Sequence, residues 1–83
     1  MTVSGLVITF MDAPEAASFA LARLHEDARL LLGEPVANRL PIVAETADAS
    51  SGETLVRELE SIAGIARVDV ISIDFAEDLD GPT

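Results

Sequence analysis

The chain has 83 residues, a hydrophobic fraction of 49%, and fifteen acidic against five basic side chains, for a formal net charge of −10. This length suits one small domain, and the hydrophobic fraction is too high for an intrinsically disordered chain. The lack of cysteine excludes disulfides and thiolate metal sites, and the negative charge disfavours nucleic acid and anionic lipid while favouring a cationic ligand.

The first predicted element is a strand over residues 3–10, VSGLVITF. Side chains along a strand alternate between two faces, so Leu6, Ile8 and Phe10 form one bulky set that we assign to the core. The smaller residues of the opposite face are Val3, Gly5, Val7 and Thr9. Both faces are apolar, as expected for a central strand.

A helix is predicted from Asp12 onward. Asp12 suits a helix cap, Pro14 is tolerated in the first turn, and Glu15 completes a capping-box pattern. Apolar residues recur at helical spacing as far as Leu31, and Gly33 is typical of a helix end. We therefore expect a helix that reaches Leu31.

Two strands are expected next. The first, over 34–37, is short and weakened by Pro35, and a tight turn at Asn38-Arg39 leads into a longer one over 40–46. Its orientation follows from the charge of Glu45, which should face solvent beside Pro41 and Val43. The core-facing set is then Leu40, Ile42 and Ala44.

A second helix is predicted over residues 50–63, because Ser50 and Glu53 match a capping box and apolar residues recur at helical spacing. Gly64 then turns the chain into a last strand that ends at Phe75. The remaining residues, 76–83, have the composition of an acidic disordered tail.

The alternation within this last strand is unusual. Arg67 and Asp69 cannot be buried without partners, so their side of the strand should point away from the core. The same alternation places on that side Ile71, Ile73 and Phe75. We expect an apolar patch that requires a ligand, a partner or a covering element.

The order strand, helix, strand, strand, helix, strand predicts an α+β, ferredoxin-like βαββαβ sandwich, with two helices on one face of an antiparallel four-stranded sheet. Residues 1–75 would form this single domain, followed by the tail over 76–83. The uncovered face is expected to hold Val3, Val7, Thr9, Pro41, Val43, Glu45, Ile71, Ile73 and Phe75. Candidate acidic residues at its rim are Glu34, Glu45, Asp69, Asp74, Glu77 and Asp78.

The residues for catalysis are few. The chain has no cysteine, lysine or tyrosine, and its single histidine, His25, is interpreted as a surface residue of the first helix. Carriers of soft metals need paired cysteines, and RNA-recognition modules need exposed aromatic residues and a basic surface. An acylphosphatase needs a phosphate cradle after the first strand, where Met11-Asp12-Ala13-Pro14 stands instead. We expect no enzymatic activity, no metal and no cofactor.

The remaining interpretation is a binding module with an apolar floor and an acidic rim, suited to a short peptide with arginines and an apolar stretch. Two alternatives stay open: contact between two copies through the uncovered face, and a small ACT-like regulatory or dimerisation module that binds a metabolite. The first residues do not read as a secretory signal, and no run of about 20 apolar residues occurs, so a soluble cytoplasmic protein is expected.

Three segments, VSGLVITF, RLPIVAE and ETLVRELESIAGIARVDVISIDF, resemble the NapD family, the cytoplasmic chaperones of the periplasmic nitrate reductase. The similarity spans roughly residues 3–75. It implies a ferredoxin-like fold without catalysis, which binds the twin-arginine signal peptide of the reductase's catalytic subunit. Export is thereby held back until the molybdenum cofactor and the iron–sulfur cluster are in place.

In this family the peptide lies on the sheet side, which implies contacts at Val7, Val43, Ile71 and Ile73. Together with the uncovered face, the resemblance yields the predicted peptide-binding residues Val7, Thr9, Val43, Glu45, Asp69, Ile71, Ile73 and Phe75. The short second strand departs from the family pattern at Pro35 and Asn38.

Overall fold

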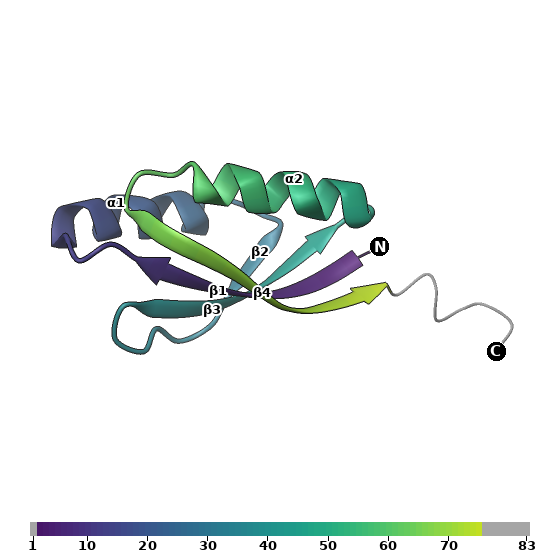
Figure 1. Cartoon of the computed structure of the whole chain (residues 1–83), viewed down its shortest axis with the longest axis horizontal. Helices are drawn as coiled ribbons and strands as arrows, with labels where there is room; N and C mark the ends of the chain where they lie inside the picture. Colours follow the sequence, from purple (N-terminus) through teal and green to yellow (C-terminus); the bar gives the residue numbers. More distant parts are fainter. Residues whose placement is uncertain (1, 76–83) are drawn as a thin grey trace, which may run out of the picture.

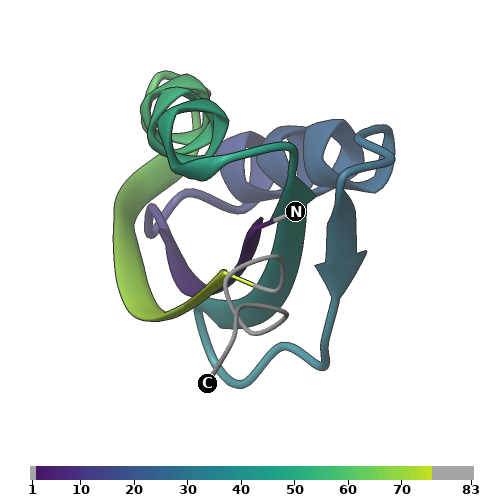
Figure 2. The same cartoon turned by 90° about the vertical axis from the view of Figure 1, so that its right-hand side faces the viewer.

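The computed structural model describes residues 2–75. Its elements are β1 (Thr2–Phe10), α1 (Pro14–His25), β2 (Leu30–Leu32), β3 (Arg39–Thr46), α2 (Ala49–Glu60) and β4 (Ile65–Phe75). The strands form one antiparallel sheet in the order β2-β3-β1-β4, and both helices lie on the same side of it (Figures 1 and 2). The fold is the expected ferredoxin-like α+β sandwich. The predicted tail over 76–83 lies outside the described residues.

The core lies between the sheet and the two helices. The predicted inward sets of β1 and β3 are confirmed, since the side chains of both sets are buried almost completely. Each helix adds two buried apolar residues, one turn apart, and the end of the core nearest Gly64 is completed from β4. These further core residues are Ala20, Leu24, Leu55, Leu59, Ile65 and Val68.

The first helix is shorter than predicted, because it ends at His25 and not at Leu31. Asp27 makes a turn after it: its Oδ1 accepts hydrogen bonds from the backbone N–H of Arg29 at 3.0 Å and from Nε of Arg29 at 2.9 Å. An aspartate that bonds to the backbone two residues on is typical of such turns. The leucines that follow form the edge strand β2, since a short apolar run fits either a helix or a strand.

The strand expected over 34–37 is also wrong. Val36 makes only an isolated bridge with Arg39, across a turn in which Ala37 has a φ of 55°. The short second strand of the fold is β2, which pairs with β3 further along the chain.

Both predicted helix caps differ from those observed. The N-cap of α1 is Ala13, which makes no side-chain cap, so Asp12 does not have the expected role. The N-cap of α2 is Asp48, whose Oδ1 accepts a hydrogen bond from the N–H of Ser51 at 2.8 Å, in place of the predicted Ser50. The helix ends at Glu60, three residues before the predicted end.

The pairing of β4 with β1 shifts register twice, between Thr9 and Phe10 and between Gly5 and Leu6, and the second shift bears on the candidate site. Val70 lies opposite Leu6 of β1, and Ser72 lies opposite Gly5, so two residues of β4 advance the chain where β1 advances by one. Ile71 is the extra residue and forms a β-bulge. A bulge inverts the alternation of every residue beyond it, and it therefore decides which side chains of β4 share a face.

Candidate functional site

The candidate site is the face of the sheet opposite the helices, which we call the open face. On β1 this face carries the residues that alternate with the buried set, and their neighbours on β3 and β4 follow from the register. The successive rows across β3, β1 and β4 are Arg39–Thr9–Arg67, Pro41–Val7–Asp69, Val43–Gly5–Ser72 and Glu45–Val3–Asp74.

An apolar band crosses this face over all four strands. It consists of Leu31, Val43, Gly5 and Ile71, and the exposed fractions of Leu31, Val43 and Ile71 are 72%, 39% and 65%. The solvated face of an antiparallel sheet is normally polar. A row of exposed branched side chains across the sheet is therefore a surface that binding would cover.

Gly5 lies within the apolar band, on a central strand. A Cβ atom at this position would lie 2.5 Å from Oγ of Ser72 and 3.3 Å from Cγ1 of Ile71. The side chains of Ile71 and Ser72 thus both lie on the open face, over the glycine. The bulge and the missing side chain together let Ile71 lie across β1.

The two ends of the open face carry opposite charges. Arg39 and Arg67 flank Thr9 at one end, which we call the basic end. Glu45 lies at the other end, beside Val3, and its side chain is exposed. Among the described residues, neither Arg39 nor Glu45 forms an ion pair.

Asp69 does not provide the free carboxylate that the acidic rim was expected to have. Its Oδ1 accepts a hydrogen bond from Nε of Arg67 at 2.8 Å, and both side chains are exposed. An exposed pair of this kind contributes about 0.2–1 kcal/mol. Glu45 is therefore the carboxylate of this face that is available to a cationic ligand within residues 2–73, where side chains are described.

The structure brings together six of the eight predicted binding residues on the open face: Val7, Thr9, Val43, Glu45, Asp69 and Ile71. The expectation for Ile73 is wrong. Ile73 lies opposite buried Ser4, and its side chain lines a groove on the helix side of the sheet, next to Val56 and Val70. The register pairs Phe75 with Thr2, and the side chain of Phe75 lies outside the described part of the structure. The bulge at Ile71 causes the difference at Ile73.

Sequence reasoning missed two members of the apolar band. The sequence pattern predicts a helix at Leu31, and it places Gly5 among the smaller residues of the first strand without including it in the uncovered face. The run Leu30-Leu31-Leu32 ahead of Gly33 fits a short strand as well as a helix end, and a glycine inside a strand often marks a bulge or a close approach on the neighbouring strand.

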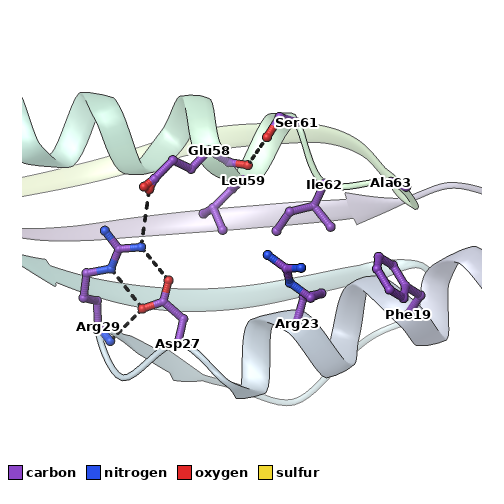
Figure 3. Close-up of a pocket in the computed structure, with 9 residues that line it drawn as sticks. All are labelled: Phe19, Arg23, Asp27, Arg29, Glu58, Leu59, Ser61, Ile62 and Ala63. Atoms are coloured by element: carbon purple, nitrogen blue, oxygen red, sulfur yellow. Dashed lines mark hydrogen bonds and ion pairs between the residues drawn. The ribbon is translucent and has the colours of Figure 1, made fainter.

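A second hollow lies on the other side of the molecule, between α1 and the end of α2, with a volume of about 440 Å³ (Figure 3). Arg29 closes its polar end, because its Nη2 lies 2.6 Å from Oδ2 of Asp27 and 3.5 Å from Oε2 of Glu58. The hydrogen bonds from the Arg29 side chain lower the pKa of Asp27, against the opposing effect of its partial burial. The same bonds raise the pKa of Arg29. These contacts tie the start of β2 to α2, which is a structural role.

Within residues 2–75, no group of three or more His, Asp or Glu side chains is placed to hold a metal ion. The helices of that part are too short and too polar to cross a membrane. Searches of protein-family models, of curated proteins and of solved structures found no match to this chain. The resemblance to the NapD family stays a prediction.

Proposed function

We propose that this protein is a chaperone whose open face binds the twin-arginine signal peptide of the periplasmic nitrate reductase catalytic subunit. The observation that carries the proposal is the apolar band beside the carboxylate of Glu45, which forms no ion pair with any other described residue. The resemblance to the NapD family supplies the identity of the peptide. While bound, the signal peptide is unavailable to the export machinery, so that the precursor is retained until its cofactors are inserted.

The two parts of such a peptide match two parts of the face. The hydrophobic stretch of the signal would cover Leu31, Val43 and Ile71, removing apolar surface from water. An arginine of the pair would form a charge-assisted hydrogen bond with Glu45. Arg39, at the basic end, repels arginines there, so the arginine pair would lie at the Glu45 end.

The first experiment is calorimetric titration of the full chain with a synthetic twin-arginine signal peptide and with a twin-lysine version. We expect tight binding of the first and clear loss with the second, since a lysine cannot reproduce the bidentate contact of an arginine. Binding of the first should also weaken as salt is raised. Equal affinity for both peptides would contradict the role of the arginines. No binding of either by a folded sample would favour an ACT-like metabolite module instead.

Two variants locate the site. Glu45→Gln should weaken binding of the twin-arginine peptide by up to about fivefold, because an exposed ion pair contributes about 0.2–1 kcal/mol. Glu60→Gln, an exposed position of α2, serves as the matched control and should bind as the wild type does.

Val43→Lys tests the apolar part. It places a charge within the band at an exposed position, so we expect a folded protein with affinity reduced at least about tenfold, or about 1.4 kcal/mol. Unchanged affinity in this variant would exclude the open face as the binding surface.

A further inference from the structure

The open face is complementary to itself in charge. On β3, Arg39 and Glu45 stand at the two ends of the face, with Pro41 and Val43 between them. The two charged residues are six positions apart, a distance of about 20 Å along a strand. Neither charge forms an ion pair within the described residues. Position 42 is the midpoint of this arrangement.

We propose that a second copy of this chain covers the open face in a two-fold symmetric dimer, in which Arg39 of each copy pairs with Glu45 of the other. The two-fold axis lies in the plane midway between the two sheets. It runs perpendicular to the strands, at the level of Ile42. It brings β3 antiparallel over its copy, and Val43 over Pro41 of the other copy. Such an interface is isologous, so each Arg–Glu pair occurs twice.

The charges select this arrangement over the other simple one. An axis parallel to the strands would place Arg39 over Arg39 and Glu45 over Glu45, and like charges facing each other are unfavourable. Sheets that pack face to face lie about 10 Å apart. The long side chains of arginine and glutamate reach across such a gap, whereas the shorter Val43 and Pro41 fill it.

The apolar band supplies the driving force. Leu31 and Ile71 are more than half exposed, at 72% and 65%, on either side of Val43. Within residues 2–73, most charged side chains lie outside this face, and Arg39 and Glu45, at the two ends of β3, carry opposite charges. The open face of a second copy thus meets an apolar centre and, at each end of β3, a charge opposite to its own. A face with only negative charges would repel its copy.

This inference does not rest on the proposed function, although both use the same face. If both hold, the dimer is the resting form and the signal peptide displaces the second copy. Peptide binding would then weaken as the protein concentration rises, because more of the face is covered.

The test is sedimentation equilibrium of the full chain over a range of concentrations, with charge-swapped variants. Arg39→Glu and Glu45→Arg should each raise the dimer dissociation constant at least about tenfold, since each replaces two attractive pairs with two repulsive ones. The double variant R39E/E45R restores opposite charges and should return to within about threefold of the wild type. Arg57→Glu, an exposed charge reversal on α2, is the control and should leave the dimer unchanged.

Two results would overturn the inference. One is a wild-type chain that stays monomeric up to about 1 mM. The other is a dimer that the single swaps weaken and the double swap does not rescue. A monomer that still binds the signal peptide leaves the proposed function intact. A dimer that behaves as described, and that no signal peptide dissociates, contradicts the proposed function and leaves the dimer in place.

Discussion

Thr2 carries a hydroxyl group that the fold buries without a hydrogen-bond partner in the part of the chain that the structure describes. Three buried residues with hydroxyl groups, Thr2, Ser4 and Thr46, lie at the end of the core beneath the start of α2. Oγ1 of Thr46 donates a hydrogen bond to the backbone oxygen of Asp48 at 3.2 Å. Oγ1 of Thr2 has no partner among the described residues, although the residue is only 2% exposed. A buried hydroxyl of this kind costs about 1–3 kcal/mol.

Thr2→Val should therefore stabilise the protein by about 1 kcal/mol, because valine has nearly the same shape and no polar group to satisfy. Urea denaturation measures the change. Thr46→Val is the matched comparison and should destabilise the protein by a similar amount, since it removes a formed hydrogen bond, while the Asp48 carbonyl keeps the bond it accepts from the N–H of Gly52 at 3.1 Å. Loss of stability in Thr2→Val would mean that its hydroxyl has a partner.

Two glycines should respond to alanine with opposite signs. Gly64 has a φ of +98°, and a Cβ there would overlap the carbonyl group of Ala16, so Gly64→Ala should destabilise by more than about 2 kcal/mol. Gly52 lies inside α2, where a Cβ would come no closer than 3.4 Å to Oγ1 of Thr46. Gly52→Ala should stabilise by about 0.5–1 kcal/mol through helix propensity. Thermal unfolding of both variants tests the two expectations. A melting temperature that shifts in the same direction in both variants would contradict the backbone geometry described for Gly64 and Gly52.

At the scale of elements, the start of α2 depends on Asp48. The hydrogen bond from the Ser51 N–H to its carboxylate lowers the pKa of Asp48. A carboxyl group whose pKa is lowered on folding contributes stability above its unfolded pKa of about 3.9, and that contribution is lost as the pH falls through the folded value. The cap therefore weakens on acidification.

Asp48→Asn separates the cap from its titration, because asparagine is an equally good N-cap and does not ionise. We expect nearly unchanged stability at pH 7 and a smaller loss of stability between about pH 5 and pH 2 than in the wild type. Urea midpoints measured across this range test the expectation. An equal loss of stability on acidification in the two proteins would show that Asp48 does not contribute to the pH dependence.

The bulge in β4 is the element that shapes the candidate site. It keeps Ile71 on the open face over Gly5, while it turns Ile73 toward the helix side. Without the extra residue, Ile71 and Ile73 would both lie on the open face. The bulge divides them between the apolar band and the groove beside α2.

For the whole molecule, the net charge of −10 opposes compactness, because like charges repel one another in the folded state. Raising the salt concentration from about 10 mM to about 300 mM should therefore increase the free energy of unfolding, as the Debye length falls from about 30 Å to below 8 Å. The same increase in salt should weaken the binding of the twin-arginine peptide. Salt should therefore raise the stability of the protein and lower its affinity for the peptide. Urea denaturation and calorimetry at both salt concentrations test this, and two effects of equal sign would be inconsistent with it.

Much of the fold could be predicted from single segments. The alternation of β1 and β3 identified their buried sets, and the charge of Glu45 oriented β3 correctly. Gly64 was expected to turn the chain, as its positive φ confirms. These features depend on residues within a few positions of one another, so local pattern was sufficient.

The tertiary structure decided the rest. Leu30 to Leu32 became a strand because β3 offered an edge to pair with, and Ile73 changed faces because the register between β4 and β1 shifts at Ile71. A register shift is a relation between two strands, so the alternation of β4 alone did not place it. The sequence by itself thus determined the order of the elements, most of the core and the net charge. The composition of the apolar band and the opposite charges at its ends depended on how the strands align, because backbone pairing between distant segments fixes which side chains become neighbours.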